Sequence, residues 1–220
     1  MLAKEYISSV IPTLSPLDSA ARALRLMNEY HLSQLPLVEE NNYIELVDET
    51  DILDWDDPDS LLENLHDRHF KPAIQENEHF LEALRICNEF KLSAIPVINK
   101  KEEFLGVIPF ENLLHGLSQF NDFKESGGLL VLEMESKDYS LAEISRIAES
   151  NDISVLGMHT WNDPVSGKLE VLLKTNRQDL QSLVATFERF SYTVAYFFGE
   201  QEEEGMLRKN YDLFMNYLSM

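Results

Sequence analysis

The first half of the chain contains two copies of one sequence unit. A constant shift aligns Pro12 with Pro72 and Pro36 with Pro96, and nine of the aligned positions are identical. A unit of about 55 residues buries only a marginal core by itself, so the two copies are predicted to pack against each other. The identical pairs are Pro12/Pro72, Ala23/Ala83, Leu24/Leu84, Arg25/Arg85, Asn28/Asn88, Glu29/Glu89, Leu32/Leu92, Ser33/Ser93 and Pro36/Pro96.

Each copy has the pattern helix–strand–strand–helix. In the first copy, Ser15-Pro16-Leu17-Asp18 predicts a helix start, with a serine cap, proline at the first helical position and an acid three residues after the cap. Apolar residues then recur at helical spacing. Two short apolar strands and the start of another helix follow. The expected strands are 35–38 and 43–47 in the first copy and 94–98 and 104–108 in the second, which has one extra residue in its turn.

This repeat resembles a tandem pair of CBS domains, also called a Bateman module, over about residues 1–120. The resemblance is carried by the strands Leu35-Pro36-Leu37-Val38 and Ile95-Pro96-Val97-Ile98 and by the segments that close each copy, 46–53 and 106–114. It implies an adenosyl ligand such as AMP, ATP or S-adenosylmethionine in clefts between the copies, and a homodimer. We place the first repeat at residues 1–58 and the second at 59–120.

The closing segments suggest which residues would contact a ligand. In CBS relatives this segment reads Gly-apolar-apolar-Ser/Thr-x-x-Asp, where the hydroxyl holds phosphate and the aspartate accepts from the ribose. The first copy has Asp48 at the hydroxyl position and keeps Asp51 at the ribose position. The second copy has Pro109 and Asn112 there. The resemblance assigns ligand contacts to Asp51 and Asn112, and also to Thr13, Pro36, Val47, Pro96 and Ile108.

These departures from the family pattern bear on the choice of ligand. A carboxylate at Asp48 would repel phosphate, and Pro109 offers neither a side-chain donor nor a backbone N–H. Adenosine, AMP or S-adenosylmethionine is therefore favoured over ATP as a regulatory ligand, and no cofactor is expected to be required. The alternative is a ligand-free dimerisation and interaction scaffold whose CBS clefts are vestigial. The sequence leaves both hypotheses open.

Residues 127–198 predict a second domain with the order β-α-β-β-α-β. An apolar strand over 129–134 is followed by a helix that Ser140 caps, with Glu143 three residues later. A hairpin loop is expected at 162–168, a second helix at 178–190 and a last strand at 192–198. This is the ferredoxin-like order. The expected fold class is therefore α/β and α+β, with a tandem CBS pair followed by a ferredoxin-like, ACT-like βαββαβ domain.

The order and length of this second domain resemble an ACT domain. A CBS pair followed by an ACT-like unit resembles the acetoin-utilisation type CBS–ACT proteins. ACT domains that bind amino acids use a glycine at the first strand–helix turn, but here residues 135–140 contain none, so a pairing role is favoured. Residues 199–220 are expected to form an acidic linker and an amphipathic helix over 206–220. This helix would dock on its own protein or on a second subunit, or else bind a separate partner protein.

The charge balance excludes several classes of partner. The chain has 39 acidic and 18 basic residues, a net charge of −21, which argues against nucleic acid and against an anionic membrane surface. Nine acids and no base lie between Glu45 and Glu63; we interpret them as a solvated loop, with a cation site as the alternative. The start of the chain lacks the apolar stretch of a signal peptide, and one cysteine is compatible with the cytoplasm.

Nothing in the local sequence supports catalysis. No Ser-His-Asp or Cys-His-Asn arrangement is suggested, and Cys87 is expected in the core of its helix. The isolated pair His66 and His69 is a weak zinc signal, so no metal site is predicted. The sequence therefore favours a cytoplasmic regulatory or sensor protein without enzymatic activity.

Overall fold

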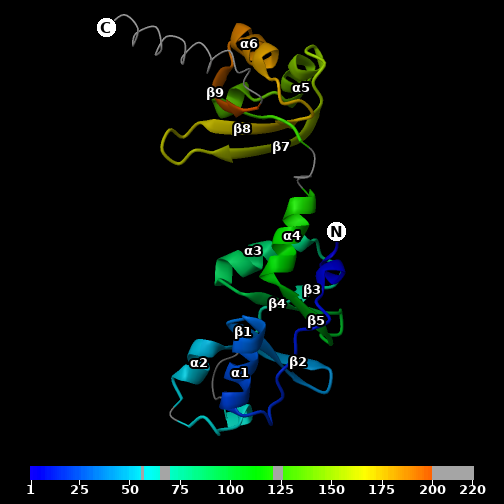
Figure 1. Ribbon diagram of the computed structural model, residues 1–220, viewed down its shortest axis with the longest axis vertical. Helices are drawn as coiled ribbons and strands as arrows, with labels where there is room; N and C mark the ends of the chain where they lie inside the picture. The colour runs from blue at the N-terminus through cyan, green and yellow to red at the C-terminus, as the bar shows by residue number, and fades with distance from the viewer. Residues whose placement is uncertain (56, 65–69, 121–125, 200–220) are drawn as a thin grey trace, which may run out of the picture. The chain divides into compact units, whose positions relative to one another are not determined.

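The structure, a computed structural model, describes residues 1–55, 57–64, 70–120 and 126–199. The chain divides into two compact units, residues 1–121 and 122–220 (Figure 1). The elements of the first unit are η1 Ala3–Tyr6, α1 Ala20–Tyr30, β1 Gln34–Glu39, β2 Asn42–Asp48, α2 Glu49–Leu53, η2 Leu62–Asn64, β3 Ile74–Gln75, α3 Phe80–Phe90, β4 Ala94–Ile98, β5 Phe104–Pro109 and α4 Phe110–Phe120. Those of the second unit are β6 Leu129–Met134, η3 Ser136–Asp138, α5 Leu141–Glu149, β7 Val155–Asn162, β8 Leu169–Thr175, α6 Gln181–Arg189 and β9 Thr193–Phe198.

The sequence repeat is also a structural repeat. Helix α1 with the hairpin β1–β2 and helix α2 corresponds to α3, β4–β5 and α4. Both first helices end on a left-handed residue, His31 with φ 54° and Lys91 with φ 55°. In both copies the chain after the hairpin is tied back to the start of its first strand. The Glu49 N–H donates to the Ser33 carbonyl, and the Phe110 N–H donates to the Ser93 carbonyl, both at 2.9 Å.

Helix α1 begins one turn later than the sequence predicts. Ser15 to Asp18 forms a turn in which the Asp18 N–H donates to the Ser15 carbonyl and the Ser15 N–H donates to the Asp18 carboxylate, both at 2.9 Å. The helix starts at Ala20, and the Ser19 hydroxyl caps it by accepting from the Arg22 N–H. The prediction of a cap at Ser15 was wrong because an aspartate side chain that bonds nearby backbone competes with helix formation.

The two repeats exchange apolar residues across their interface. The core around α3 and β4 includes Tyr43 and Leu46 from β2 of the first repeat. The core around α1 and β1 includes Ala94 and Val107 from the second repeat. All four residues are at most 3% exposed. The prediction that the copies pack together is confirmed, because each copy completes the core of the other.

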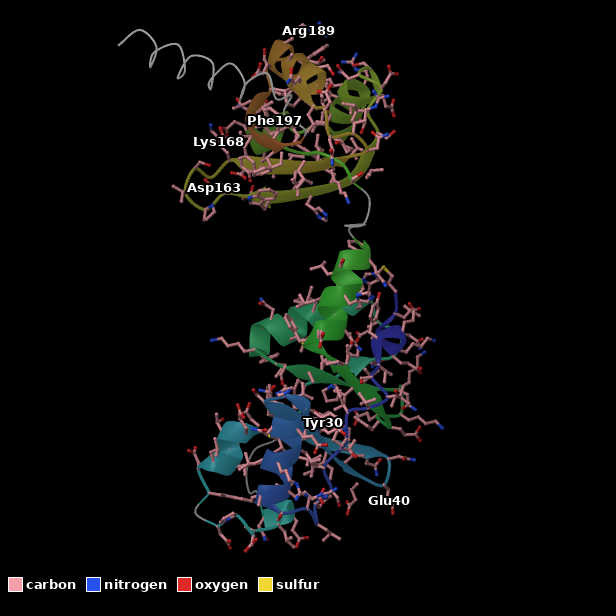
Figure 2. The ribbon with its side chains drawn as sticks, viewed as in Figure 1. Tyr30, Glu40, Asp163, Lys168, Arg189 and Phe197 are labelled. Carbon is pink, nitrogen blue, oxygen red and sulfur yellow. The ribbon has the colours of Figure 1, made fainter. Side chains whose placement is uncertain are left out.

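The second unit has the ferredoxin-like topology. Its sheet has the order β7-β8-β6-β9 with every neighbouring pair antiparallel. Helices α5 and α6 lie together on one face of this sheet (Figure 1), over a core that includes Leu130, Leu132, Leu173 and Phe187. The β7–β8 loop carries Asp163 and Lys168 (Figure 2). The expected fold class is confirmed, and the Ser140 hydroxyl accepts from the Glu143 N–H as predicted.

Several expectations fall outside the described residues. The histidine pair at 66 and 69 and the expected C-terminal helix over 206–220 are both in that part of the chain. Within the described ranges, no helix is long and apolar enough to cross a membrane. The same ranges contain no group of three or more His, Cys, Asp or Glu side chains placed to hold a metal ion. The cation alternative for the acidic run therefore gains no support from the described residues.

Candidate functional site

The ligand-contact residues expected in the first repeat lie on adjoining segments. Thr13 is exposed and precedes Leu14, whose N–H donates to the Pro36 carbonyl at 2.8 Å. On β2, Val47 pairs with Leu35 and is 3% exposed. Pro36 is also buried. Of Thr13, Pro36 and Val47, only Thr13 is exposed to solvent.

Asp48 and Asp51 occupy the start of the short helix α2. The Asp48 carboxylate caps this helix by accepting from the Thr50 N–H at 2.8 Å and from the Thr50 hydroxyl at 2.7 Å. Asp51 lies in the first turn and is half-buried. Asp48 thus has a structural role at the position where CBS relatives place a phosphate-binding hydroxyl. Asp51 is the carboxylate left at the position expected to contact ribose.

A buried glutamine connects Asp48 to the second repeat. The Gln34 side-chain amide donates to Asp48 Oδ2 at 2.6 Å. Its Oε1 accepts from the Ser93 N–H at 2.8 Å and from the Ser93 hydroxyl at 2.7 Å. The Ser93 oxygen accepts in turn from the Ser33 N–H at 3.0 Å. Gln34 is 6% exposed, so this network is a polar link inside the interface between the repeats.

The sequence interpretation missed this network. Gln34 aligns with Ala94, whereas its partner Ser93 aligns with Ser33. The sequence signal for this network is Gln34 itself, a polar residue at a strand position where the other copy has the apolar Ala94. A buried amide requires hydrogen-bond partners, and the second copy supplies them.

In the second repeat, two of the expected contact residues are buried and the third, Asn112, is bonded to the N-terminal segment. Ile108 is fully buried and Pro96 is buried. The Asn112 amide donates to the Tyr6 carbonyl at 2.9 Å. Gly106 has φ +151°, and a Cβ there would overlap the Ile7 side chain. The Tyr6 ring packs on Phe80 with centroids 5.2 Å apart. Asn112 therefore already has a structural partner.

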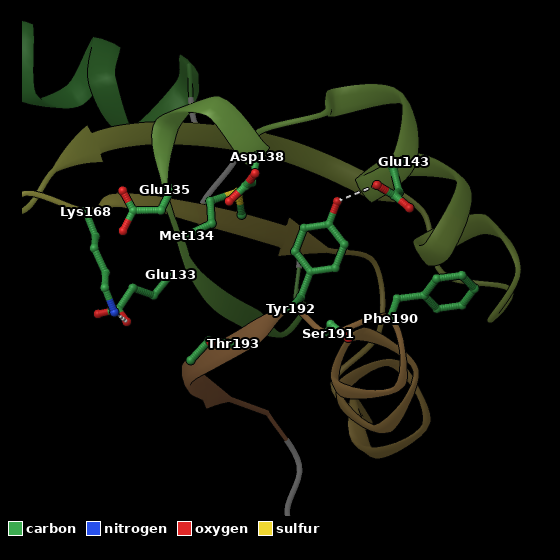
Figure 3. Close-up of a pocket in the computed structure, with 10 residues that line it drawn as sticks. All are labelled: Glu133, Met134, Glu135, Asp138, Glu143, Lys168, Phe190, Ser191, Tyr192 and Thr193. Carbon is green, nitrogen blue, oxygen red and sulfur yellow. Dashed lines mark hydrogen bonds and ion pairs between the residues drawn. The ribbon is translucent and has the colours of Figure 1, made fainter.

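The second unit contains a pocket of about 450 Å³ at one end of its sheet (Figure 3). Lys168 Nζ donates to Glu133 at 2.6 Å, and this hydrogen bond raises the pKa of Lys168. The Tyr192 hydroxyl donates to Glu143 at 2.9 Å. Burial, followed by this hydrogen bond, raises the pKa of Tyr192 to about 12. The other lining residues are Met134, Glu135, Asp138, Phe190, Ser191 and Thr193. The pocket is acidic because its lining contains four carboxylates and one lysine.

Comparisons with known proteins place the first unit in a family. Residues 3–57 and 68–119 match the model of the CBS domain family. The repeated hairpins with their shared cores and these two matches define the first unit as a tandem pair of CBS domains, as the sequence predicted.

A curated relative is an inosine-5'-monophosphate dehydrogenase of Korarchaeum cryptofilum, 22% identical over 167 residues. The alignment covers 74% of this chain and 34% of that protein, so the chain spans about a third of the length of this relative.

Solved structures with a similar fold include CBS-domain proteins. A CBS domain pair/ACT domain protein of Thermotoga maritima is 19% identical, with a TM-score of 0.49 over 55% of this chain and 98% of that one. The structure of CBSX2 in complex with AMP is 16% identical, with a TM-score of 0.46 over 54% of this chain and 97% of that one.

Proposed function

We propose that the CBS pair is a non-enzymatic regulatory module that binds an adenosyl ligand in its first repeat. The observation that carries this proposal is the pair of CBS domains in which Asp51, in the first turn of α2, keeps the position that the resemblance assigns to ribose contact. A carboxylate accepts hydrogen bonds from two neighbouring ribose hydroxyls. Ligand binding would regulate by favouring one arrangement of the two repeats over another.

The charges near Asp51 favour a ligand with little phosphate. The Asp48 carboxylate is fixed by Thr50 and Gln34, so it would stay close to a phosphate placed as in CBS relatives. That contact is repulsive and more costly in a partly buried cleft than in water. We therefore favour adenosine, AMP or S-adenosylmethionine over ATP. Asn112, which is bonded to Tyr6, makes the second repeat the weaker site.

Thermal shift measurements on the full chain test the ligand proposal. Adenosine, AMP and S-adenosylmethionine at millimolar concentration should each be compared with ATP, because a ligand that binds only the folded state raises the melting temperature. We expect Asp51→Ala to abolish the shift and Asp54→Ala to preserve it. Asp54 is the matched control because it is an exposed aspartate at the other end of α2. No shift with any adenosyl ligand would sink the proposal.

A ligand-free scaffold is the second candidate function. It is favoured by the contacts of the N-terminal segment with the second closing segment. Ile7 packs against Gly106, and the Tyr6 carbonyl accepts from the Asn112 amide. Under this reading the chain is a homodimer in the cytoplasm and its surfaces serve assembly with a protein partner. Light scattering at micromolar concentration tests this: a dimer that no adenosyl ligand stabilises supports the scaffold, and a monomer contradicts the dimer.

For the second unit we favour an ACT-like pairing role over amino-acid binding. Its turn after β6 lacks glycine, and the adjoining pocket carries Glu135 and Asp138, which would repel the carboxylate of an amino acid. Calorimetric titration with the twenty amino acids should show no binding. Saturable binding of any of them would overturn this assignment.

A further inference from the structure

The second unit has one sheet face that no described element of that unit covers. Strand β6 directs Leu130 and Leu132 to the helices, so Leu129 and Val131 lie on the opposite face. In β9, Phe198 pairs with Leu129 and Tyr196 pairs with Val131. The same face continues across β8 and β7. We call it the open face. Its charged members are Glu133, Glu170 and Lys174, and its apolar members are Leu129, Val131, Trp161, Leu172, Tyr196 and Phe198.

The open face exposes aromatic side chains. Phe198 is 64% exposed, Tyr196 is 46% exposed and Trp161 is 38% exposed. The Tyr196 and Phe198 rings meet edge to face with centroids 5.7 Å apart. Helices α5 and α6 cover only the other face of the sheet (Figure 1). Val131, which pairs with Tyr196, is 1% exposed, so the exposed apolar part of this face consists mainly of these aromatic rings. Large exposed apolar side chains on one sheet face mark a docking surface.

The chain leaves the described structure at the edge of this face. Residues 200–220 follow Gly199, which comes directly after Phe198. A Cβ on Gly199 would overlap the Gln178 carbonyl, so the backbone is held closely at the exit. A depression of about 280 Å³ lies there, lined by Gly127, Leu129, Gln178, Phe198 and Gly199. The remaining chain therefore starts beside two members of the open face.

The segment after the exit has the length and pattern to cover that face. We propose that residues 206–220 of the same chain form an amphipathic helix that packs on the open face. A 15-residue helix is about 22 Å long, and a six-residue strand such as β6 is about 20 Å long. Residues 199–205 span at most about 23 Å, enough for a reversal. The apolar residues at helical spacing are Leu207, Tyr211, Phe214, Met215 and Leu218.

Tethering favours this segment over a second copy of the chain. A segment joined to Phe198 through the short linker 199–205 meets the face at an effective concentration in the millimolar range. A second copy would have to bind from free solution.

Quenching of Trp161 fluorescence by acrylamide tests the proposal in the full chain. Trp55 is the other of the two tryptophans, so Trp55→Phe makes Trp161 the sole reporter on the open face. Phe214→Asp adds a carboxylate to the apolar side of the segment. Asn216→Asp adds the same charge about 200° away around the helix and is the matched control.

We expect Phe214→Asp to raise the Trp161 quenching constant roughly twofold, because apolar area returns to solvent, and Asn216→Asp to leave it unchanged. Circular dichroism of both variants checks that the second unit stays folded. An unchanged quenching constant in Phe214→Asp would overturn the proposal. That result is also the one expected if the first unit, and not residues 206–220, covered the open face. The proposal would also be overturned if the protection of Trp161 from acrylamide were lost on dilution and light scattering showed a dimer. A second copy of the chain would then be the occupant of the open face.

Discussion

At the residue scale, Gln34 is the side chain whose role reaches furthest beyond its own repeat. It accepts from Ser93, donates to Asp48 and is almost completely buried. We expect Gln34→Leu to destabilise the first unit by about 2 kcal/mol, because the Ser93 N–H and hydroxyl lose a buried acceptor. Urea unfolding measures the change. Gln119→Leu, at an exposed position, is the control and should change the free energy of unfolding little.

Tyr192 makes a pH-dependent contribution to the stability of the second unit. Burial and Glu143 raise its pKa to about 12 in the folded state, against about 10 in an unfolded chain. The stabilisation is therefore present below about pH 10 and is lost as the pH rises through about 12. The measurement is the urea midpoint across this range in the native chain and in Tyr192→Phe. The substitution should flatten the decline, and an equally steep decline would contradict the assignment.

Cys87 is expected to be inert in the folded protein. It is 1% exposed, and burial raises the pKa of its thiol to about 12. Because the thiolate is the reactive form, a thiol reagent at pH 8 should react only as fast as the first unit opens. The rate is measured with and without urea. Rapid stoichiometric modification of the native chain would show that this part of the core is open to solvent.

At the scale of elements, the first helix provides a comparison between two serines. The Ser19 hydroxyl lies 3.3 Å from the Arg22 N–H, a group at the start of α1 that has no partner within the helix. The Ser15 hydroxyl lies 3.4 Å from the Leu17 N–H, which belongs to the preceding turn. We expect Ser19→Ala to cost about 1 kcal/mol and Ser15→Ala to cost less. Urea unfolding of the two variants decides the order, and a larger loss at Ser15 would mean that the helix begins earlier.

The strands and their order were predictable, whereas the partners of the candidate site residues were not. Apolar runs such as Leu35–Val38 mark strands directly, and repetition of the pattern fixed their assignment. Asp51 and Asn112 were found from a motif. The bonds of Asn112 to Tyr6 and of Gln34 to Ser93 join residues 106 and 59 positions apart. Local patterns carry no information about contacts over such separations.

At the scale of the whole molecule, the two compact units are expected to unfold in separable transitions. Each unit holds one tryptophan, Trp55 in the first and Trp161 in the second. Leu173→Ala removes a fully buried side chain from the second core and should cost about 2–5 kcal/mol there. Single-tryptophan variants followed in urea should show the Trp161 transition moving alone. Equal movement of both would reveal that the units unfold as one.

The hydrogen bonds of Gln34 also make the two repeats of the first unit non-equivalent. Ser33 and Ser93 are equivalent, but the residues after them are Gln34 and Ala94, and Asp48 has Pro109 as its counterpart. A chain rebuilt from two identical averaged repeats would therefore contain either two opposed glutamines or none. The two repeats therefore cannot replace each other. A chain with two identical repeats would lose the hydrogen bonds of Gln34 to Ser93 and Asp48, which only the present asymmetric pair can form.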